Sequence, residues 1–60
     1  MSQSLPKDPV ILLSFINTAL RDHYASLDEL CKTLMVDQTA LEQTLRTIDY
    51  SYDDAQNQFV

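Results

Sequence analysis

The 60-residue chain contains no glycine, and this restricts the ways in which it can turn. A residue with positive φ is common at tight turns and helix ends, and glycine adopts it at little cost, followed by Asn and Asp. We therefore expect left-handed positions to be occupied by Asn or Asp, with Asn57 as the candidate in the polar segment 53–57. A glycine-rich phosphate-binding loop is excluded.

Three helix-start signals divide the first 48 residues. Asp8-Pro9 is a typical N-cap followed by a proline at the first helical position. Ser26 and Glu29 have the spacing of a capping box, and Asp37 is a third N-cap. Apolar residues recur with a helical period after each signal. In the first helix the apolar half, which we expect to face the core, consists of Leu12, Leu13, Phe15, Ile16, Ala19 and Leu20. We predict helices over 9–24, 27–35 and 38–48.

The hydrophobic pattern then changes. Tyr50-Ser51-Tyr52 alternates with a period of two, a polar cluster follows, and the chain closes with Gln58-Phe59-Val60. This predicts a hairpin with strands near 50–53 and 57–60, in which Tyr50, Tyr52 and Phe59 cover the open side of the helices. The fold class is therefore mostly α (α+β): one domain over 1–60, with residues 1–7 as a flexible N-terminal arm.

The segment from Ser26 to Ile48 resembles the helix-turn-helix of bacterial winged-helix regulators. Leucines line its first helix, Cys31 is a small residue where the helices cross, and Val36 fills the turn. The hairpin takes the place of the wing, and residues 23–25 would supply a short extra strand. The resemblance departs at Met35, where the turn usually has glycine. It implies a recognition-helix face made of Gln38, Thr39, Glu42, Gln43 and Arg46.

The charge distribution argues against that face binding nucleic acid. Lys7, Asp8, Arg21 and Asp22 cancel within residues 1–25, so the whole net charge of −5 belongs to residues 26–60. Nucleic-acid binding begins with neutralisation of phosphates by basic side chains. We therefore do not expect nucleic acid as a partner and predict no duplex DNA binding at physiological salt. A regulator that binds weakly or with a basic partner is the alternative.

The full chain is also similar to a small bacterial family, domain-of-unknown-function family 4250. The similarity is carried by LPKDPVILLSFINTALRDHYASLDELC near the start and YSYDDAQNQFV at the end. It implies a free-standing bacterial protein, and it implies no activity.

No residue pattern predicts an enzyme, a metal site or a cofactor site, and no small-molecule ligand is expected. His23 lies near the apolar side of the first helix without a second histidine, so we interpret it as a partly buried helix-end residue. Cys31 lies in the middle of a helix within an apolar stripe, whereas an activated thiol needs a nearby cation or a helix start, so we interpret it as a small core residue. Asp53-Asp54 lacks the ligand spacing of a calcium loop.

Location and partners follow from composition and periodicity. A lone cysteine, a polar start and the absence of a long apolar run predict a cytoplasmic protein without membrane contact. Val10 and Ile11 fall on the polar side of the first helix, and with Leu5 they form a candidate apolar interaction surface. We predict a protein-interaction module, as a homodimer or with another protein. The competing hypothesis is that the arm folds back and Leu5 covers Ile11.

Overall fold

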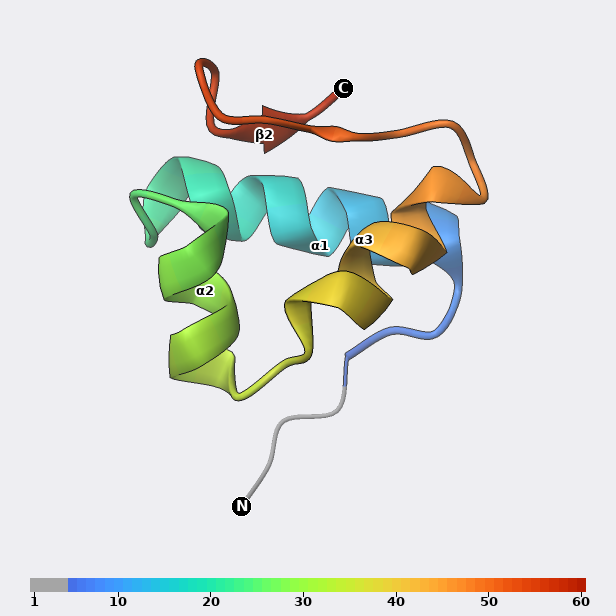
Figure 1. Cartoon of the computed structure of the whole chain (residues 1–60), viewed down its shortest axis with the longest axis horizontal. Coiled ribbons are helices and arrows are strands. Elements are labelled where there is room, and N and C mark those ends of the chain that lie inside the picture. Colours follow the sequence, from blue (N-terminus) through green and yellow to red (C-terminus); the bar gives the residue numbers. More distant parts are fainter. Residues whose placement is uncertain (1–4) are drawn as a thin grey trace.

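The computed structural model describes residues 5–60, which form three helices and a small hairpin (Figure 1). The helices are α1 (Pro9–Asp22), α2 (Leu27–Leu34) and α3 (Gln38–Arg46), and the strands are β1 (Tyr52–Asp53) and β2 (Gln58–Phe59). The strands are antiparallel, with Tyr52 opposite Phe59 and Asp53 opposite Gln58. The predicted mostly α fold with a C-terminal hairpin is confirmed, although each strand is shorter than predicted.

Each helix begins where its capping residue predicts. The Asp8 carboxylate accepts a hydrogen bond from the backbone N–H of Val10 at 2.9 Å. The Ser26 hydroxyl accepts from the N–H of Glu29 at 3.1 Å, and the Asp37 carboxylate accepts from that of Thr39 at 3.0 Å. These contacts satisfy amides that a helix start otherwise leaves unpaired.

The helix ends correct the expectation that only Asn or Asp would be left-handed. Among residues 5–60, Asn57 and Asp49 have positive φ, and so does Met35, with φ 59° and ψ 46°. At Met35 the N–H of Val36 donates to the Cys31 carbonyl at 2.9 Å, which closes a Schellman motif at the end of α2. The tight connection to α3 requires this conformation, and Met35 adopts it because the sequence has no glycine there.

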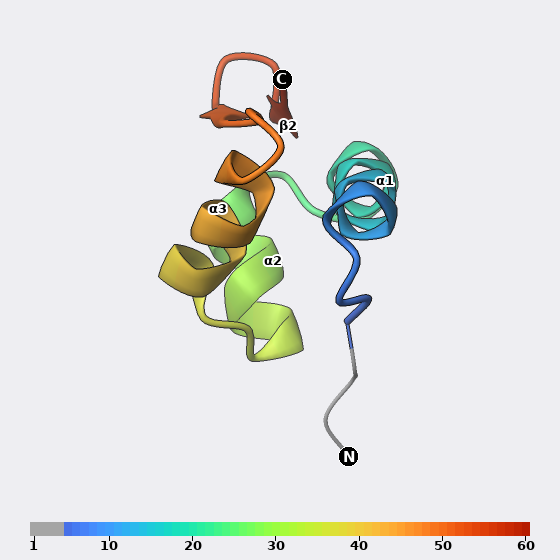
Figure 2. The ribbon, with the colours of Figure 1, turned by 90° about the vertical axis from the view of Figure 1, so that its right-hand side faces the viewer.

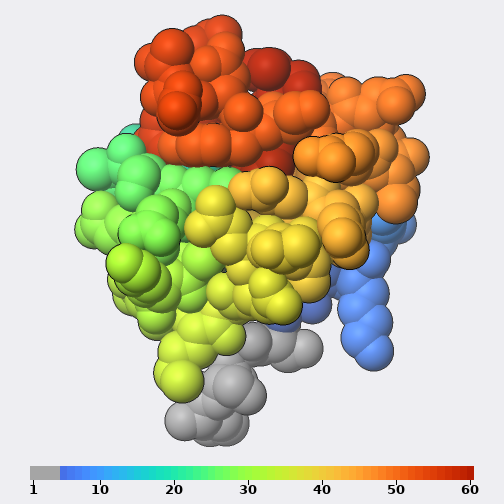
Figure 3. Space-filling model, in the orientation of Figure 1, coloured from blue at the N-terminus to red at the C-terminus, as the bar shows by residue number. Residues whose placement is uncertain are grey.

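The core lies between α1 and the α2–α3 pair and is closed by the hairpin. Figure 2 shows α1 nearly end-on, with α2 and α3 on one side of it only, and in Figure 3 the hairpin forms a layer over the helices. Ile16, Leu30 and Leu45 are completely buried, and Phe59 enters from the hairpin. The other buried residues are Leu12, Ala19, Leu20, Leu27, Cys31 and Leu41.

Four sequence-based expectations were wrong. Phe15 was expected to face inward, but it is 39% exposed because α1 buries only the narrower stripe of Leu12, Ile16, Ala19 and Leu20. His23 is exposed at the end of α1, beyond the part of the helix that meets the core. Residues 23–25 form a turn instead of an extra strand. Tyr50 was expected to cover the helices, but it is 36% exposed, and Tyr52 and Phe59 pack there instead.

Candidate interaction surface

The outward side of α1 is an exposed helical surface, which we call the α1 face. It consists of Val10, Ile11, Ser14, Phe15, Thr18, Arg21 and Asp22, all of which are exposed. Val10 is 63% exposed and Ile11 57%, so two large aliphatic side chains lie in solvent, and the exposed Phe15 follows Ile11 by four residues on the same helix side. In Figure 2 the side of α1 turned away from α2 and α3 carries no other part of the described chain. Exposed apolar patches of this kind often mark contact surfaces.

Leu5 does not lie on the exposed surface with Val10 and Ile11, as the sequence predicted. Leu5 is partly buried and packs against the core. It lines an apolar groove of about 300 Å³ between the arm and the start of α3, together with Leu12, Val36 and Leu41. Val10 and Ile11 do not line this groove and remain exposed. The candidate surface therefore keeps Val10 and Ile11, gains Phe15 and loses Leu5; residues 1–4 of the predicted arm lie outside the described part.

At one edge of the α1 face, the side-chain amide of Asn17 forms hydrogen bonds with the hairpin. The Asn17 side chain accepts from the Phe59 N–H at 2.8 Å and donates to the Phe59 carbonyl at 3.1 Å. Its amide thus takes the place of a neighbouring strand for the outer edge of β2. Because this edge is occupied, β2 is not free to pair with another chain through Phe59.

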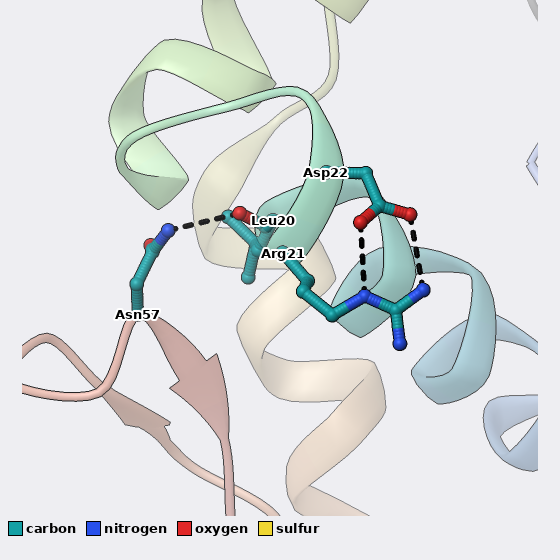
Figure 4. A network of polar contacts seen from close by, with 4 residues as sticks. All are labelled: Leu20, Arg21, Asp22 and Asn57. Atoms are coloured by element: carbon teal, nitrogen blue, oxygen red, sulfur yellow. Dashed lines mark hydrogen bonds and ion pairs between the residues drawn. The ribbon is translucent and has the colours of Figure 1, made fainter.

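A second polar network joins the hairpin turn to the end of α1. The Asn57 amide donates to the carbonyls of Leu20 at 3.1 Å and Tyr24 at 3.0 Å, and its oxygen accepts from the Tyr52 hydroxyl at 2.6 Å. The same hydroxyl accepts from the N–H of Leu27 at 3.3 Å. Figure 4 shows Asn57 reaching the last turn of α1, with the Arg21–Asp22 pair beside it. This network connects the hairpin turn to the last turn of α1, where the candidate surface ends.

The charged end of the α1 face is an ion pair within the helix. The Arg21 guanidinium donates to both oxygens of Asp22, at 2.9 and 3.0 Å. These hydrogen bonds, with a smaller contribution from charge attraction, hold the pKa of the Asp22 carboxyl below its usual value. Both side chains remain substantially exposed, so they are available to a second molecule.

The alternative recognition-helix face has little capacity to bind phosphate. Gln38 donates to the Glu42 carboxylate at 3.0 Å, so both side chains are already engaged. Thr39, Gln43 and Arg46 are exposed, which leaves one basic and one acidic residue on this face. The neighbouring hairpin adds Asp53 and Asp54 without a basic residue.

Chemically reactive side chains do not gather at any point of the described chain. Residues 5–60 contain no cluster of three His, Cys, Asp or Glu side chains placed to hold a metal ion. Burial raises the pKa of the Cys31 thiol, with smaller contributions from Glu42, Asp28 and Asp37, which keeps it protonated at neutral pH. Within the same residues, no helix has both the length and the apolar character of a membrane span.

Comparison with known families identifies the chain. The model of the domain of unknown function DUF4250 matches residues 6–59, so the chain belongs to this family. No curated protein and no solved structure matches it.

Proposed function

We propose that this DUF4250 chain is a non-enzymatic protein-interaction module that self-associates through the α1 face. The exposure of Val10, Ile11 and Phe15 on a helix side that no described element covers carries the proposal. A 60-residue chain buries only about 60% of the surface that it exposes when unfolded, so a shared interface adds apolar burial that one copy lacks.

The charge distribution favours a second copy on this face. Arg21 and Asp22 neutralise each other within the α1 face, whereas residues 26–60 carry the net charge of −5. Two copies that met through α2, α3 or the hairpin would bring acidic surfaces together. Contact through the α1 face keeps those surfaces apart.

The order α2, turn, α3, hairpin supports a winged-helix-like scaffold as part of the proposal. In this interpretation the helix-turn-helix supplies packing, since the α3 face offers Arg46 as its only basic residue. Its role is to present α1 as a straight, supported helix. Nucleic-acid binding, the alternative function, has no comparable observation in its favour.

Sedimentation velocity over a concentration series tests the proposal. We expect the wild-type chain to be a dimer at tens of micromolar and Ile11→Asp to be a monomer. Position 11 lies in the first turn of α1, where an acidic side chain is favourable to the helix dipole, so the substitution leaves the monomer folded.

Thr39→Asp is the matched control, because it places the same side chain in the first turn of α3 at an exposed position. We expect it to dimerise as the wild type does. A wild-type chain that stays monomeric at these concentrations would refute the proposal. Equal loss of the dimer in both variants would show that added charge, instead of the α1 face, controls association.

A further inference from the structure

We infer that two copies pair through their α1 helices in antiparallel orientation, in a register set by the charges at the two ends of α1. This inference rests on the proposed self-association and specifies its geometry. It arises from the charged residues at the two ends of α1: Lys7 and Asp8, which lie in the arm just before the helix, and Arg21 and Asp22, which are in its last turn.

The order of these charges is self-complementary only in antiparallel orientation. Consider a two-fold axis that passes between residues 14 and 15. It places Lys7 opposite Asp22 of the second copy and Asp8 opposite Arg21, so each of these contacts joins unlike charges. All four side chains are exposed, while Asp8 also caps α1, Lys7 borders the apolar groove beside Leu5, and Arg21 bonds to Asp22 within the single chain.

A parallel pair has the reverse property. Each charged residue then lies at the level of its own counterpart, so that Lys7 meets Lys7, and Arg21 meets Arg21. Parallel α1 helices also bring their dipoles into the same direction, whereas antiparallel helices set a positive end against a negative end. The charges therefore select the antiparallel arrangement.

The same axis matches the apolar part of the α1 face. Ile11 lies opposite Thr18 of the second copy, and these residues share one helix side because they are seven positions apart. Ser14, a small residue next to the axis, allows the helices to approach, and Phe15 packs across the axis beside it. Both are exposed in the single chain and would become buried in the pair.

A charge-exchange series tests the register. Lys7→Glu and Asp22→Lys each place like charges opposite one another at both ends of the antiparallel pair, and the double variant restores unlike pairs. Each single change puts an acidic residue near the start or a basic residue near the end of α1, which suits the helix dipole. Asp22→Lys also removes the ion pair with Arg21, but that pair is exposed and contributes little to stability, so the monomer stays folded and a weaker dimer reports on the contact.

We expect each single variant to raise the dimer dissociation constant by about three- to tenfold at low salt and the double variant to return it to near the wild-type value. Failure of the double variant to recover would overturn the antiparallel register. If the wild-type chain is monomeric throughout, the proposed self-association itself fails. If the dimer dissociation constant is the same in all three variants as in the wild type, self-association remains supported and only the register is refuted.

Disulfide trapping gives a second, charge-independent test in a Cys31→Ala background. In the inferred pair, Thr18 and the Thr18 of the second copy are about 10 Å apart along the helix axis, beyond the roughly 7 Å that a disulfide can bridge. We expect Thr18→Cys alone to give no covalent dimer, and a mixture of Thr18→Cys with Ile11→Cys to give a mixed one. Efficient cross-linking of Thr18→Cys alone would indicate a parallel pair and refute the inference.

Discussion

The two sides of α1 belong to one helix, yet they are organised in different ways. The inner side buries Leu12, Ile16 and Leu20, each less than 5% exposed, against α2, α3 and the hairpin. The outer side leaves Val10 and Ile11 more than half exposed. The comparison separates the apolar residues that one chain buries when it folds from those that it leaves exposed. The inner side already supplies the packing of the monomer, so the outer aliphatic residues are available for another role.

Replacing one isoleucine on each side tests this comparison directly and should give the largest effect. Ile16 is 0% exposed and Ile11 57% exposed. Ile16→Ala should lower the free energy of unfolding by about 2–5 kcal/mol, because it removes buried methyl groups and leaves a cavity. Ile11→Ala should change that of the monomer by less than about 0.5 kcal/mol, as surface substitutions usually do.

Urea denaturation at low micromolar concentration, where association is weak, measures both changes. If Ile16→Ala does not fold, Ile16→Val should still cost about 0.5–1.5 kcal/mol. At higher concentration the dimer dissociation constant is the quantity compared, and there Ile11→Ala should have the larger effect, because it weakens the dimer. Equal destabilisation of the monomer by the two alanine variants would contradict the division of α1 into a structural and a free side.

The Asn17 contact defines where the inner side ends, and its loss should have an intermediate effect. Asn17→Ala leaves the buried N–H and the carbonyl of Phe59 without their partners. We expect a loss of about 1–3 kcal/mol, since an unpaired buried polar group costs its full desolvation penalty.

Amide hydrogen exchange provides the specific measurement, because the Phe59 N–H should exchange faster in Asn17→Ala. Thr18→Ala is the control, since Thr18 is the next residue and is exposed. Because Thr18 belongs to the α1 face, this control is measured at low micromolar concentration, where its effect on the stability of the monomer should stay within about 0.5 kcal/mol. Unchanged protection of the Phe59 amide would show that Asn17 does not hold the strand.

The smallest expected effect is a gain in stability, at Met35. This residue is left-handed and 87% exposed, so its side chain adds little packing where its backbone is unfavourable. Met35→Gly should raise the free energy of unfolding by about 0.5–1 kcal/mol, because glycine adopts this conformation without a Cβ clash.

Met35→Ala separates the two contributions, since it removes the side chain but keeps the Cβ. We expect no gain from the alanine variant in thermal or urea denaturation. A similar gain in both variants would attribute the effect to removal of an exposed apolar side chain. Neither change touches the α1 face, so the dimer dissociation constant should stay as in the wild type.

The sequence predicted the local features of the fold well. The N-caps Asp8, Ser26 and Asp37 each bond to a backbone amide two or three residues away, so their signal is contained in a short segment. The same holds for the hairpin, where alternation and a polar turn lie within eleven residues. Helical periodicity also placed Val10 and Ile11 on the exposed side, because it needs only the order of apolar residues.

Tertiary structure decided which apolar side chains are buried, because burial depends on how much of each helix the other elements cover. Periodicity assigned Phe15 to the inner half of α1, but the width of the contact with α2 and α3 determines where that half ends. Leu5 was grouped with its sequence neighbours, whereas it packs against the core beside residues of α3 that lie more than thirty positions away. Periodicity along one helix contains no information about such distant partners.

The sequence by itself thus determined where the helices begin, that the chain closes with a hairpin, and that its net charge of −5 belongs to residues 26–60. Only the tertiary structure decided that Asn17 forms hydrogen bonds with a strand 42 residues away and that Met35 adopts the left-handed conformation. The physical reason is the range of the interactions. Caps and periodicity act within one or two helical turns. The hydrogen bonds of Asn17 and the conformation of Met35 depend on packing that brings distant segments together.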